Sequence, residues 1–186
     1  MTTPRVPSLR DEDMDEEQKN AVAPFRSAPR IDNVGRTLLN HPALMTSWLP
    51  FARHVMFETT LAPREREILI LRTGWLCRAE YEWAQHVRFG KAAGLADVDI
   101  ANIMAGPDAP GLALGDRLLL QTADELHNNF RIGDALWNQL VSHYERKQLL
   151  DIVFAVGQYT LVSMMLNSFG VEVDDYLKGG YPALPA

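Results

Sequence analysis

Glu82 and His86 lie four residues apart in the segment 79–93, which has the composition of a helix. At that spacing two side chains share one face of a helix, so a carboxylate and an imidazole are neighbours. A histidine exchanges a proton near neutral pH, and an adjacent carboxylate holds its tautomer and supports its charged form. The pair therefore predicts a proton-transfer centre, with Trp83 and Tyr81 beside it as candidate substrate-binding residues.

Spacing alone leaves other uses of these residues open. Glu82 and His86 could be an ordinary surface pair that adds about a few tenths of a kcal/mol to helix stability. With Glu67 as a third ligand they could hold a metal ion, although no second histidine is close in the sequence. Trp83 and Tyr81 could equally be packing residues of the core or of an interface.

The stretch EILILRTGWLCRAEYEWAQHVRFG, residues 67–90, resembles the carboxymuconolactone decarboxylase and alkylhydroperoxidase D superfamily. In the peroxidase branch of that superfamily a Glu is followed by a Cys-x-x-Cys pair and then by a His. The matching positions here are Glu67, Ala79, Glu82 and His86, so both motif cysteines are absent. The resemblance covers residues 40–175 and favours the decarboxylase branch, in which a His precedes a basic, small-residue stretch that ends at a Gly.

The resemblance implies an all-α fold, an alkylhydroperoxidase D-like helical bundle, and a lyase that uses neither a cofactor nor a metal. It implies that His86 is a proton donor or relay exposed to a cleft, with Glu67 and Glu82 as its orienting or acid/base partners. The expected substrate is a small carboxylated lactone or a related product of aromatic-compound breakdown. Which carboxylate contacts His86 stays open, and a hydrolase or isomerase with the same relay is a close alternative.

Two further classes of function remain as alternatives. The first is an alkylhydroperoxidase-like peroxide reductase, but Cys77 is the only cysteine and does not stand at either motif position. A two-cysteine cycle within the chain is therefore excluded, and an external thiol would be needed. The second alternative is a non-catalytic helical oligomer or binding protein. The joint presence of Glu67, Glu82 and His86 counts against it.

The composition is that of a globular protein, because 47% of the 186 residues are apolar and 23% are charged. The net charge is −6 and no Lys/Arg cluster occurs, which argues against a nucleic-acid or anionic-membrane partner. The N-terminal segment lacks the apolar region that a signal peptide has. No later run that is free of polar residues is long enough to span a membrane. We therefore expect a cytoplasmic protein with a small-molecule substrate.

Helical signals are nearly continuous from Asn33 onward and no segment alternates as a strand does, which predicts an all-α protein. We divide the chain into an N-terminal tail with a short helix, residues 1–32, and a helical domain, residues 33–186. Residues 1–10 are expected to be flexible, residues 24–33 to be a connector, and Pro50 to kink its helix. The expected helices are 11–23, 34–39, 41–57, 63–76, 79–93, 97–104, 114–130, 134–143 and 145–169.

The last helix carries a polar stripe, Thr160, Ser163 and Asn167, with Tyr159 beside it. A polar stripe on a buried helix must find hydrogen bonds in facing helices, a partner subunit or a ligand. Packing or oligomer contacts are the simpler use. Asn167, which resembles an Asn near the end of the corresponding family helix, and Tyr159 are the substrate-binding candidates on this helix.

Helices 63–76 and 149–169 are apolar on nearly every side. A monomer of this size does not readily bury so much apolar surface. Members of the resembled superfamily are commonly trimers or hexamers. We therefore expect a homo-oligomer of one of these sizes, with the reactive cleft near a subunit interface.

Overall fold

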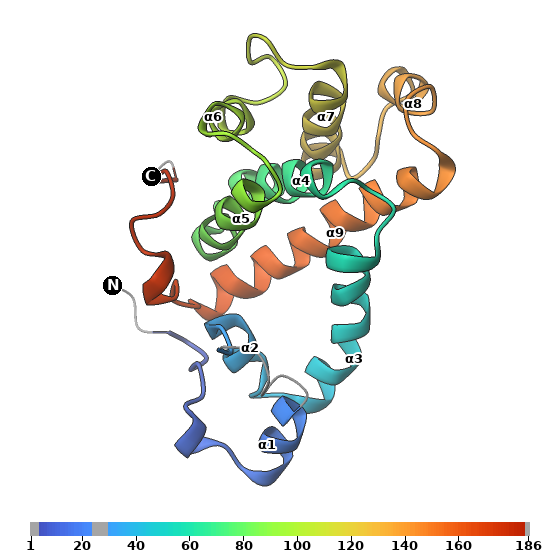
Figure 1. The fold of residues 1–186 in the computed structure, drawn as a ribbon. Coiled ribbons are helices and arrows are strands. Elements are labelled where there is room, and N and C mark those ends of the chain that lie inside the picture. The colour runs from blue at the N-terminus through green and yellow to red at the C-terminus, as the bar shows by residue number, and fades with distance from the viewer. Residues whose placement is uncertain (1–3, 24–29, 185–186) are drawn as a thin grey trace.

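The computed structural model describes residues 4–23 and 30–184, which form nine α-helices and no strand (Figure 1). The all-α fold predicted from the sequence is confirmed. A π-helical turn, η3, follows the third helix at His54–Glu58. The helices are Glu16–Val22 (α1), Asn33–Leu38 (α2), Pro42–Arg53 (α3), Pro63–Leu76 (α4), Glu80–Ala92 (α5), Asp97–Ala105 (α6), Leu114–Asn129 (α7), Asp134–Leu140 (α8) and Arg146–Phe169 (α9).

Helix α4 is the centre of the bundle and packs against α5, α7 and α9. Its four middle residues, 68–71, are at most 1% exposed, so the helix is covered on every side. It begins at Pro63, where a proline costs no hydrogen bond, and the Ala62 backbone N–H donates to the Glu65 side chain at 3.2 Å. Polar side chains in the middle of this helix, Glu67 among them, are therefore held inside the protein.

A tight turn joins α4 to α5 and sets the two helices close together. Arg78 has a left-handed backbone, φ 52°, and the Ala79 N–H donates to the Gly74 carbonyl at 3.0 Å. A Cβ atom at Gly74 would lie 3.4 Å from Cγ of Glu82. The absence of a side chain at Gly74 therefore lets the first turn of α5 approach α4, and α5 presents Glu82 to the interior.

The predicted helix 41–57 is divided into α3 and the π-helical turn. Pro50 lies inside α3 and has no backbone N–H to donate to the preceding turn. The wider turn that follows buries Val55 and Met56 and leaves Phe57 73% exposed. Single π-helical turns occur frequently at functional sites, and this one borders the cavity described below.

The N-terminal residues from Pro4 onward pack on the helical domain. The Arg5 N–H donates to the Phe169 carbonyl at 2.8 Å, and Met14 and Val22 are buried in one cluster with Leu39. The expectation of a flexible tail is therefore wrong for residues 4–10. Most of the expected connector, residues 24–29, lies outside the described residues.

Helix α9 is long and apolar enough to cross a membrane by length and composition alone, with a mean hydropathy of 1.7 over 18 residues. The sequence-based expectation concerned only runs free of polar residues, and α9 contains polar residues such as Asp151 and Gln158. Half of the 18-residue window is buried inside the chain, as in the core helix of a bundle. The exposed remainder carries large apolar side chains, among them Leu150, Phe154, Leu161 and Met164.

Candidate active site

His86 on α5 lies between two carboxylates in the interior of the bundle. Its Nδ1 is 2.7 Å from Oε2 of Glu67 on α4, and its Nε2 is 2.9 Å from Oε1 of Glu82. Glu67 is fully buried, and Glu82 and His86 are only 4% and 5% exposed. The sequence left open which carboxylate contacts the imidazole, and in the structure both do.

The two carboxylates approach the ring differently. Glu67 comes from the facing helix and makes an aligned hydrogen bond with Nδ1. Glu82 is one turn before His86 on the same helix, so it reaches Nε2 from the side, and its Oε1 has no aligned hydrogen-bond partner among the described residues. A buried carboxylate oxygen without such a bond is costly unless a ligand or water supplies one.

Arg66 fixes the carboxylate of Glu67. Its Nε and Nη2 both donate to Oε1, at 2.9 and 2.8 Å, which leaves Oε2 for the imidazole. Burial opposes the charged form of Glu67, but His86 and then Arg66 outweigh it and lower the pKa of this carboxyl. Glu67 is therefore a fixed anion that orients the ring. Sequence reasoning missed Arg66 because the direction of a side chain next to Glu67 cannot be deduced from its position.

The pKa of His86 is set by a competition between burial and charge. Burial alone would lower it, but Glu82 and Glu67 together raise the pKa to about 10. The ring is therefore an imidazolium at neutral pH. Its charge and that of Arg66 balance the two carboxylates, so the group as a whole is neutral. In the described part of the chain, no three His, Cys, Asp or Glu side chains are placed to hold a metal ion.

Glu82 and His86 line a cavity of about 550 Å³ between α3, the π-helical turn, α5 and α9. That volume suits a small organic molecule. The Tyr159 ring meets the imidazole edge-on, with 4.9 Å between ring centroids. His86 thus lies at the wall of a cavity, and its side chain is more buried than the sequence suggested. The larger apolar groups of the wall are Trp48, Met56, Phe57, Phe89, Tyr159 and Val162.

Of the four predicted substrate-binding residues, Tyr159 and Tyr81 line this cavity, whereas Trp83 and Asn167 do not. Trp83 is fully buried, donates from Nε1 to the Pro182 carbonyl at 2.7 Å and packs on Trp75. The Asn167 amide donates to the Cys77 carbonyl at 2.9 Å. The cavity residues from α3, such as Trp48, carry no sequence signal that separates them from core residues.

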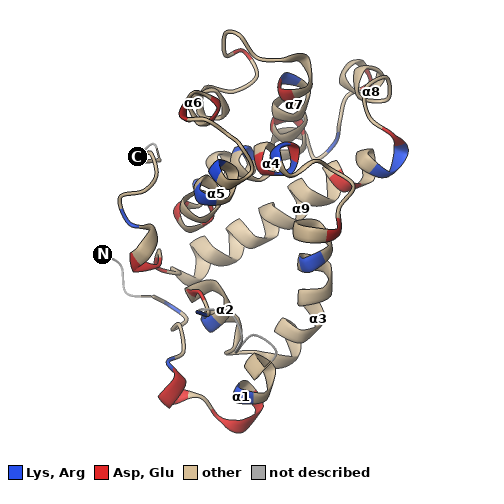
Figure 2. Ribbon diagram, in the orientation of Figure 1, with Lys and Arg blue, Asp and Glu red and all other residues tan. Residues whose placement is uncertain are grey.

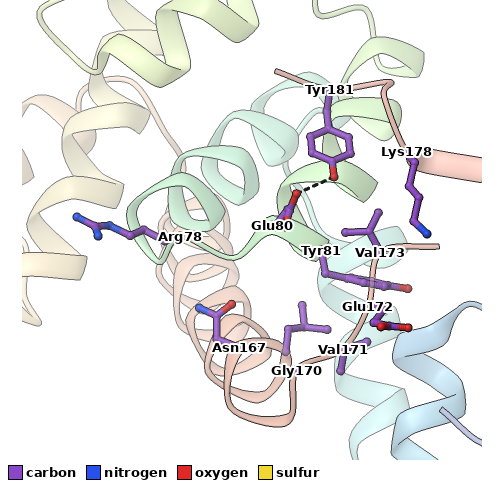
Figure 3. A pocket seen from close by; sticks show the side chains of 11 residues that line it. Arg78, Glu80, Tyr81, Asn167, Gly170, Val171, Glu172, Val173, Lys178 and Tyr181 are labelled. Carbon is purple, nitrogen blue, oxygen red and sulfur yellow. Dashed lines mark hydrogen bonds between the residues drawn. The ribbon is translucent and has the colours of Figure 1, made fainter. Parts of the chain in front are cut away.

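A second cavity, of about 530 Å³, lies at the start of α5 and takes in Arg78, Glu80 and Asn167 (Figure 3). None of its described lining residues is a histidine, and neither Glu67 nor Glu82 reaches it. The Tyr181 hydroxyl donates to Glu80 at 2.9 Å across its wall. We therefore place the candidate chemistry in the cavity that contains His86.

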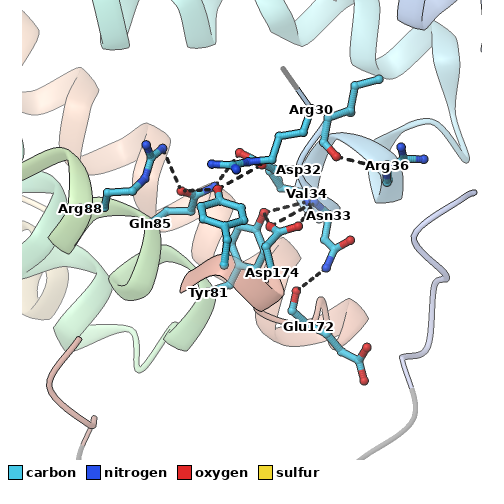
Figure 4. A network of polar contacts seen from close by, with 12 residues as sticks. Arg30, Asp32, Asn33, Val34, Arg36, Tyr81, Gln85, Arg88, Glu172 and Asp174 are labelled. Carbon is cyan, nitrogen blue, oxygen red and sulfur yellow. Dashed lines mark hydrogen bonds and ion pairs between the residues drawn. The ribbon is translucent and has the colours of Figure 1, made fainter. Parts of the chain in front are cut away.

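Two segments from opposite ends of the chain meet at α5 in a network of polar contacts (Figure 4). Gln85 on α5 donates to Asp32 at 2.7 Å, and Asp32 itself lines the cavity. The Tyr81 hydroxyl donates to Asp174 at 2.6 Å, and Asp174 also accepts from the Asn33 N–H at 3.1 Å. These bonds join residues 32–33 and 174 to the face of α5 beside Glu82 and His86.

Residues 42–114 match the model of the carboxymuconolactone decarboxylase family. A comparison with curated proteins finds no match. Among solved structures, the chain is similar to an uncharacterized peroxidase-related protein from Ralstonia eutropha JMP134, described as an alkylhydroperoxidase AhpD core. The identity is 16%, the TM-score is 0.81, and 95% of each chain is covered.

Two other solved structures have the same fold. An uncharacterized peroxidase-related protein from Silicibacter sp. TM1040 is 16% identical, with a TM-score of 0.79 over 96% of this chain and 98% of that one. The debrominase Bmp8, in complex with 2,3,4-tribromopyrrole, is 9% identical, with a TM-score of 0.76 over 96% and 95%. Residues 42–114, from α3 to the first residue of α7, are thus similar to the carboxymuconolactone decarboxylase family, and the chain as a whole has the fold of these alkylhydroperoxidase-like structures.

Proposed function

We propose that the protein is a cofactor-independent lyase that acts by proton transfer on a small carboxylated lactone or a related product of aromatic-compound breakdown. The observation that carries the proposal is the His86 imidazolium, held between Glu67 and Glu82 at the wall of a small-molecule cavity. The family match supports a reaction of this type. The same relay would also serve a hydrolase or an isomerase.

In the proposed reaction the bond between the substrate carbon and its carboxylate breaks and CO₂ leaves. The electron pair stays on the carbon as an enolate, which must then take up a proton. His86 holds one proton toward Glu67 through Nδ1 and presents Nε2 toward Glu82. Glu82 lines the cavity, so its carboxylate takes the Nε2 proton from the imidazolium and gives it to the substrate carbon, and a proton from water then restores the imidazolium.

The surroundings favour this reaction in two ways. The cavity wall is largely apolar, so a bound carboxylate loses much of its hydration. This loss favours the release of CO₂, because CO₂ is uncharged and does not need that hydration. The developing enolate lies near the imidazolium, whose charge is held in place before the reaction begins. Both effects act on the transition state and need no group beyond the residues of this chain.

The peroxide reductase alternative has less support. Cys77 does not line the His86 cavity, and its Sγ is 3.8 Å from Nδ1 of His127. Burial raises the pKa of the Cys77 thiol, whereas a reactive cysteine needs a lowered one. A non-catalytic binding protein would leave unexplained why three ionisable side chains are buried together at a cavity wall.

The test is CO₂ release from a panel of small carboxylated lactones, by wild type, His86→Gln and Glu82→Gln. We expect each substitution to lower turnover by about a hundredfold, the usual contribution of a positioned acid or base. His143→Gln, at an exposed histidine outside the cavity, is the matched control and should keep wild-type turnover. Full turnover by His86→Gln would refute the proposal.

His86→Ala is a poorer test than the sequence suggested. The side chain is buried between two carboxylates, so its removal leaves two buried anions without their shared cation. Such a loss costs about 3 to 5 kcal/mol, more than the small change expected for a cleft-exposed histidine. Glutamine also removes the positive charge but keeps a hydrogen-bond donor between the two carboxylates, and circular dichroism of each variant checks that the helices remain.

A further inference from the structure

We infer that Arg53 binds a carboxylate of the ligand and is the one cation of the described cavity wall that is free to do so. A second carboxylate on the same ligand would therefore remain unpaired. The inference rests on the proposed function, because it places a carboxylated molecule in the His86 cavity. It adds a binding residue, Arg53, that is indicated neither by the sequence motif nor by the geometry of Glu67, Glu82 and His86. It also specifies the ligand as an apolar body with a single anchored carboxylate.

The charges that line the cavity give the first step. Arg53 is the only Lys or Arg among its described lining residues. His86 is cationic, but both of its nitrogens already face buried carboxylates. The carboxyl groups of the wall, those of Asp32 and Glu82, are acidic. An incoming carboxylate therefore has one cation to bind, and a second carboxylate would be desolvated without a partner, which is unfavourable.

The pairing of Arg53 gives the second step. Its Nε is 2.8 Å from Oε1 of Glu58, and the two side chains are 74% and 50% exposed. Exposed pairs of this kind contribute little to stability, so a ligand carboxylate can replace Glu58 at small cost. The planar guanidinium can donate two parallel hydrogen bonds to a carboxylate, whether that carboxylate belongs to Glu58 or to a ligand. The buried partners of His86 cannot be exchanged in this way.

The position of Arg53 gives the third step. It is the last residue of α3, and the π-helical turn that follows carries both Glu58 and the exposed Phe57. Arg53 thus lies at the solvent end of the cavity, while Glu82 and His86 form its buried end. A ligand anchored on Arg53 extends its apolar body past Trp48 and Phe57 toward the imidazolium. A second carboxylate on that body is the unpaired group, and it is the one whose loss as CO₂ the site favours.

The experiment measures binding rather than turnover, by isothermal titration with three aromatic probes. Benzoate carries one carboxylate, isophthalate carries two, and monomethyl isophthalate has the size of the diacid with one charge. We expect both monoacids to bind wild type at millimolar concentration and isophthalate to bind about tenfold more weakly or worse. Arg53→Gln should weaken both monoacids by about tenfold, and Glu58→Gln should strengthen them by removing the competing carboxylate.

Arg10→Gln is the matched control, since Arg10 is 69% exposed, pairs with Asp13 at 2.8 Å and does not line the cavity. It should bind all three probes as wild type does. The inference is overturned if Arg53→Gln binds the monoacids normally, if isophthalate binds as tightly as its monoester, or if neither monoacid binds. Failure of the proposed function has a different signature, namely His86→Gln that retains turnover while binding still depends on Arg53.

Discussion

The two carboxylates around His86 have different roles because they reach the ring from different helices. Glu67, from α4, is aligned with Nδ1 and fixed by two bonds from Arg66. Glu82, from the same helix as His86, has an oxygen without an aligned partner and lines the cavity. The first carboxylate therefore sets the position and charge of the ring, and the second is free to exchange a proton with a ligand.

This division predicts unequal stabilities for two otherwise identical substitutions. Glu67→Gln removes the carboxylate that pairs with the buried His86 and the part-buried Arg66, and should cost about 3 to 5 kcal/mol of unfolding free energy. Glu82→Gln leaves His86 paired with Glu67 and should cost about 1 to 2 kcal/mol. Urea unfolding near neutral pH measures both. Equal losses would contradict the assignment of Glu67 as the fixed anion.

The raised pKa of His86 predicts a pH dependence of stability. The pKa rises from 6.5 to about 10 in the folded protein, so folding favours the protonated ring. The resulting stability is fully present below pH 6.5 and is lost as the pH rises toward about 10. The gap in unfolding free energy between wild type and His86→Gln should therefore shrink over that range. A gap that widens with pH would mean that His86 is buried as the neutral base.

Cys77 provides a separate test at the residue scale. It lies outside the His86 cavity, and burial raises the pKa of its thiol. Cys77→Ser should therefore keep wild-type turnover in the CO₂-release assay, since no step of the proposed reaction uses a thiol. A folded Cys77→Ser protein that had lost its activity would restore the peroxide reductase alternative.

The sequence predicts part of this site and misses the rest for identifiable reasons. Glu82 and His86 follow from helical spacing, and Glu67 follows from the superfamily pattern. Arg66 and Arg53 could not be recognised, because an arginine next to a motif or at a helix end is usually solvated and its direction depends on packing. Trp83 lies in the core instead of the cavity, since the neighbour of a site residue on a helix points about 100° away from it.

At the scale of elements, the turn between α4 and α5 decides whether the site can form. Gly74 lets Glu82 pack against α4, with 3.4 Å between Cγ of Glu82 and a Cβ built on the glycine. A larger side chain at residue 74 would therefore push the first turn of α5 outward. His86, one turn later, would shift relative to Glu67.

Gly74→Val should accordingly lower turnover and cost about 1 to 3 kcal/mol through overpacking. Gly157→Val is the control for unfolding free energy, because Gly157 is also inside a helix and a Cβ there meets nothing within 4 Å. Turnover of Gly74→Val is compared with wild type alone, since Gly157 lies beside Phe154 and Leu161 on the exposed side of α9. Both variants share the small helix penalty of a β-branched residue, so the difference between them isolates the contact with Glu82. The same losses in both variants would show that the close approach at Gly74 does not matter.

The elements themselves were largely predictable because apolar periodicity and end signals agree along most of the chain. Helix α4 has the predicted bounds, and α5 and α9 differ from theirs by one residue at most. The helix predicted at 134–143 ends early, at Leu140, and the π-helical turn after Pro50 was not foreseen. A proline indicates that a helix is perturbed, but the packing of Val55 and Met56 determines the form of the perturbation.

At the scale of the whole molecule, charged residues are sparse along α3 and along the second half of α9 (Figure 2). The exposed side of α9 instead carries Phe154, Leu161 and Met164, and Phe51 of α3 meets Phe154 edge to face with 5.9 Å between ring centroids. Contiguous apolar surface of this kind marks an interaction site. We propose that it is the interface of a homo-oligomer, as the apolar character of α9 suggested.

The oligomer would also contribute to the His86 cavity, because Trp48 and Val162 line both that cavity and an adjoining apolar groove next to Leu161 and Met164. Wild type should therefore be an oligomer by light scattering at micromolar concentration, and the superfamily resemblance implies a trimer or a hexamer. Met164→Glu should dissociate it, since a carboxylate in an apolar interface lacks a partner. Val98→Glu, at a 64% exposed position on α6, should leave the mass unchanged. A stable wild-type monomer would refute the interface. We also expect the dissociated variant to bind benzoate more weakly than wild type.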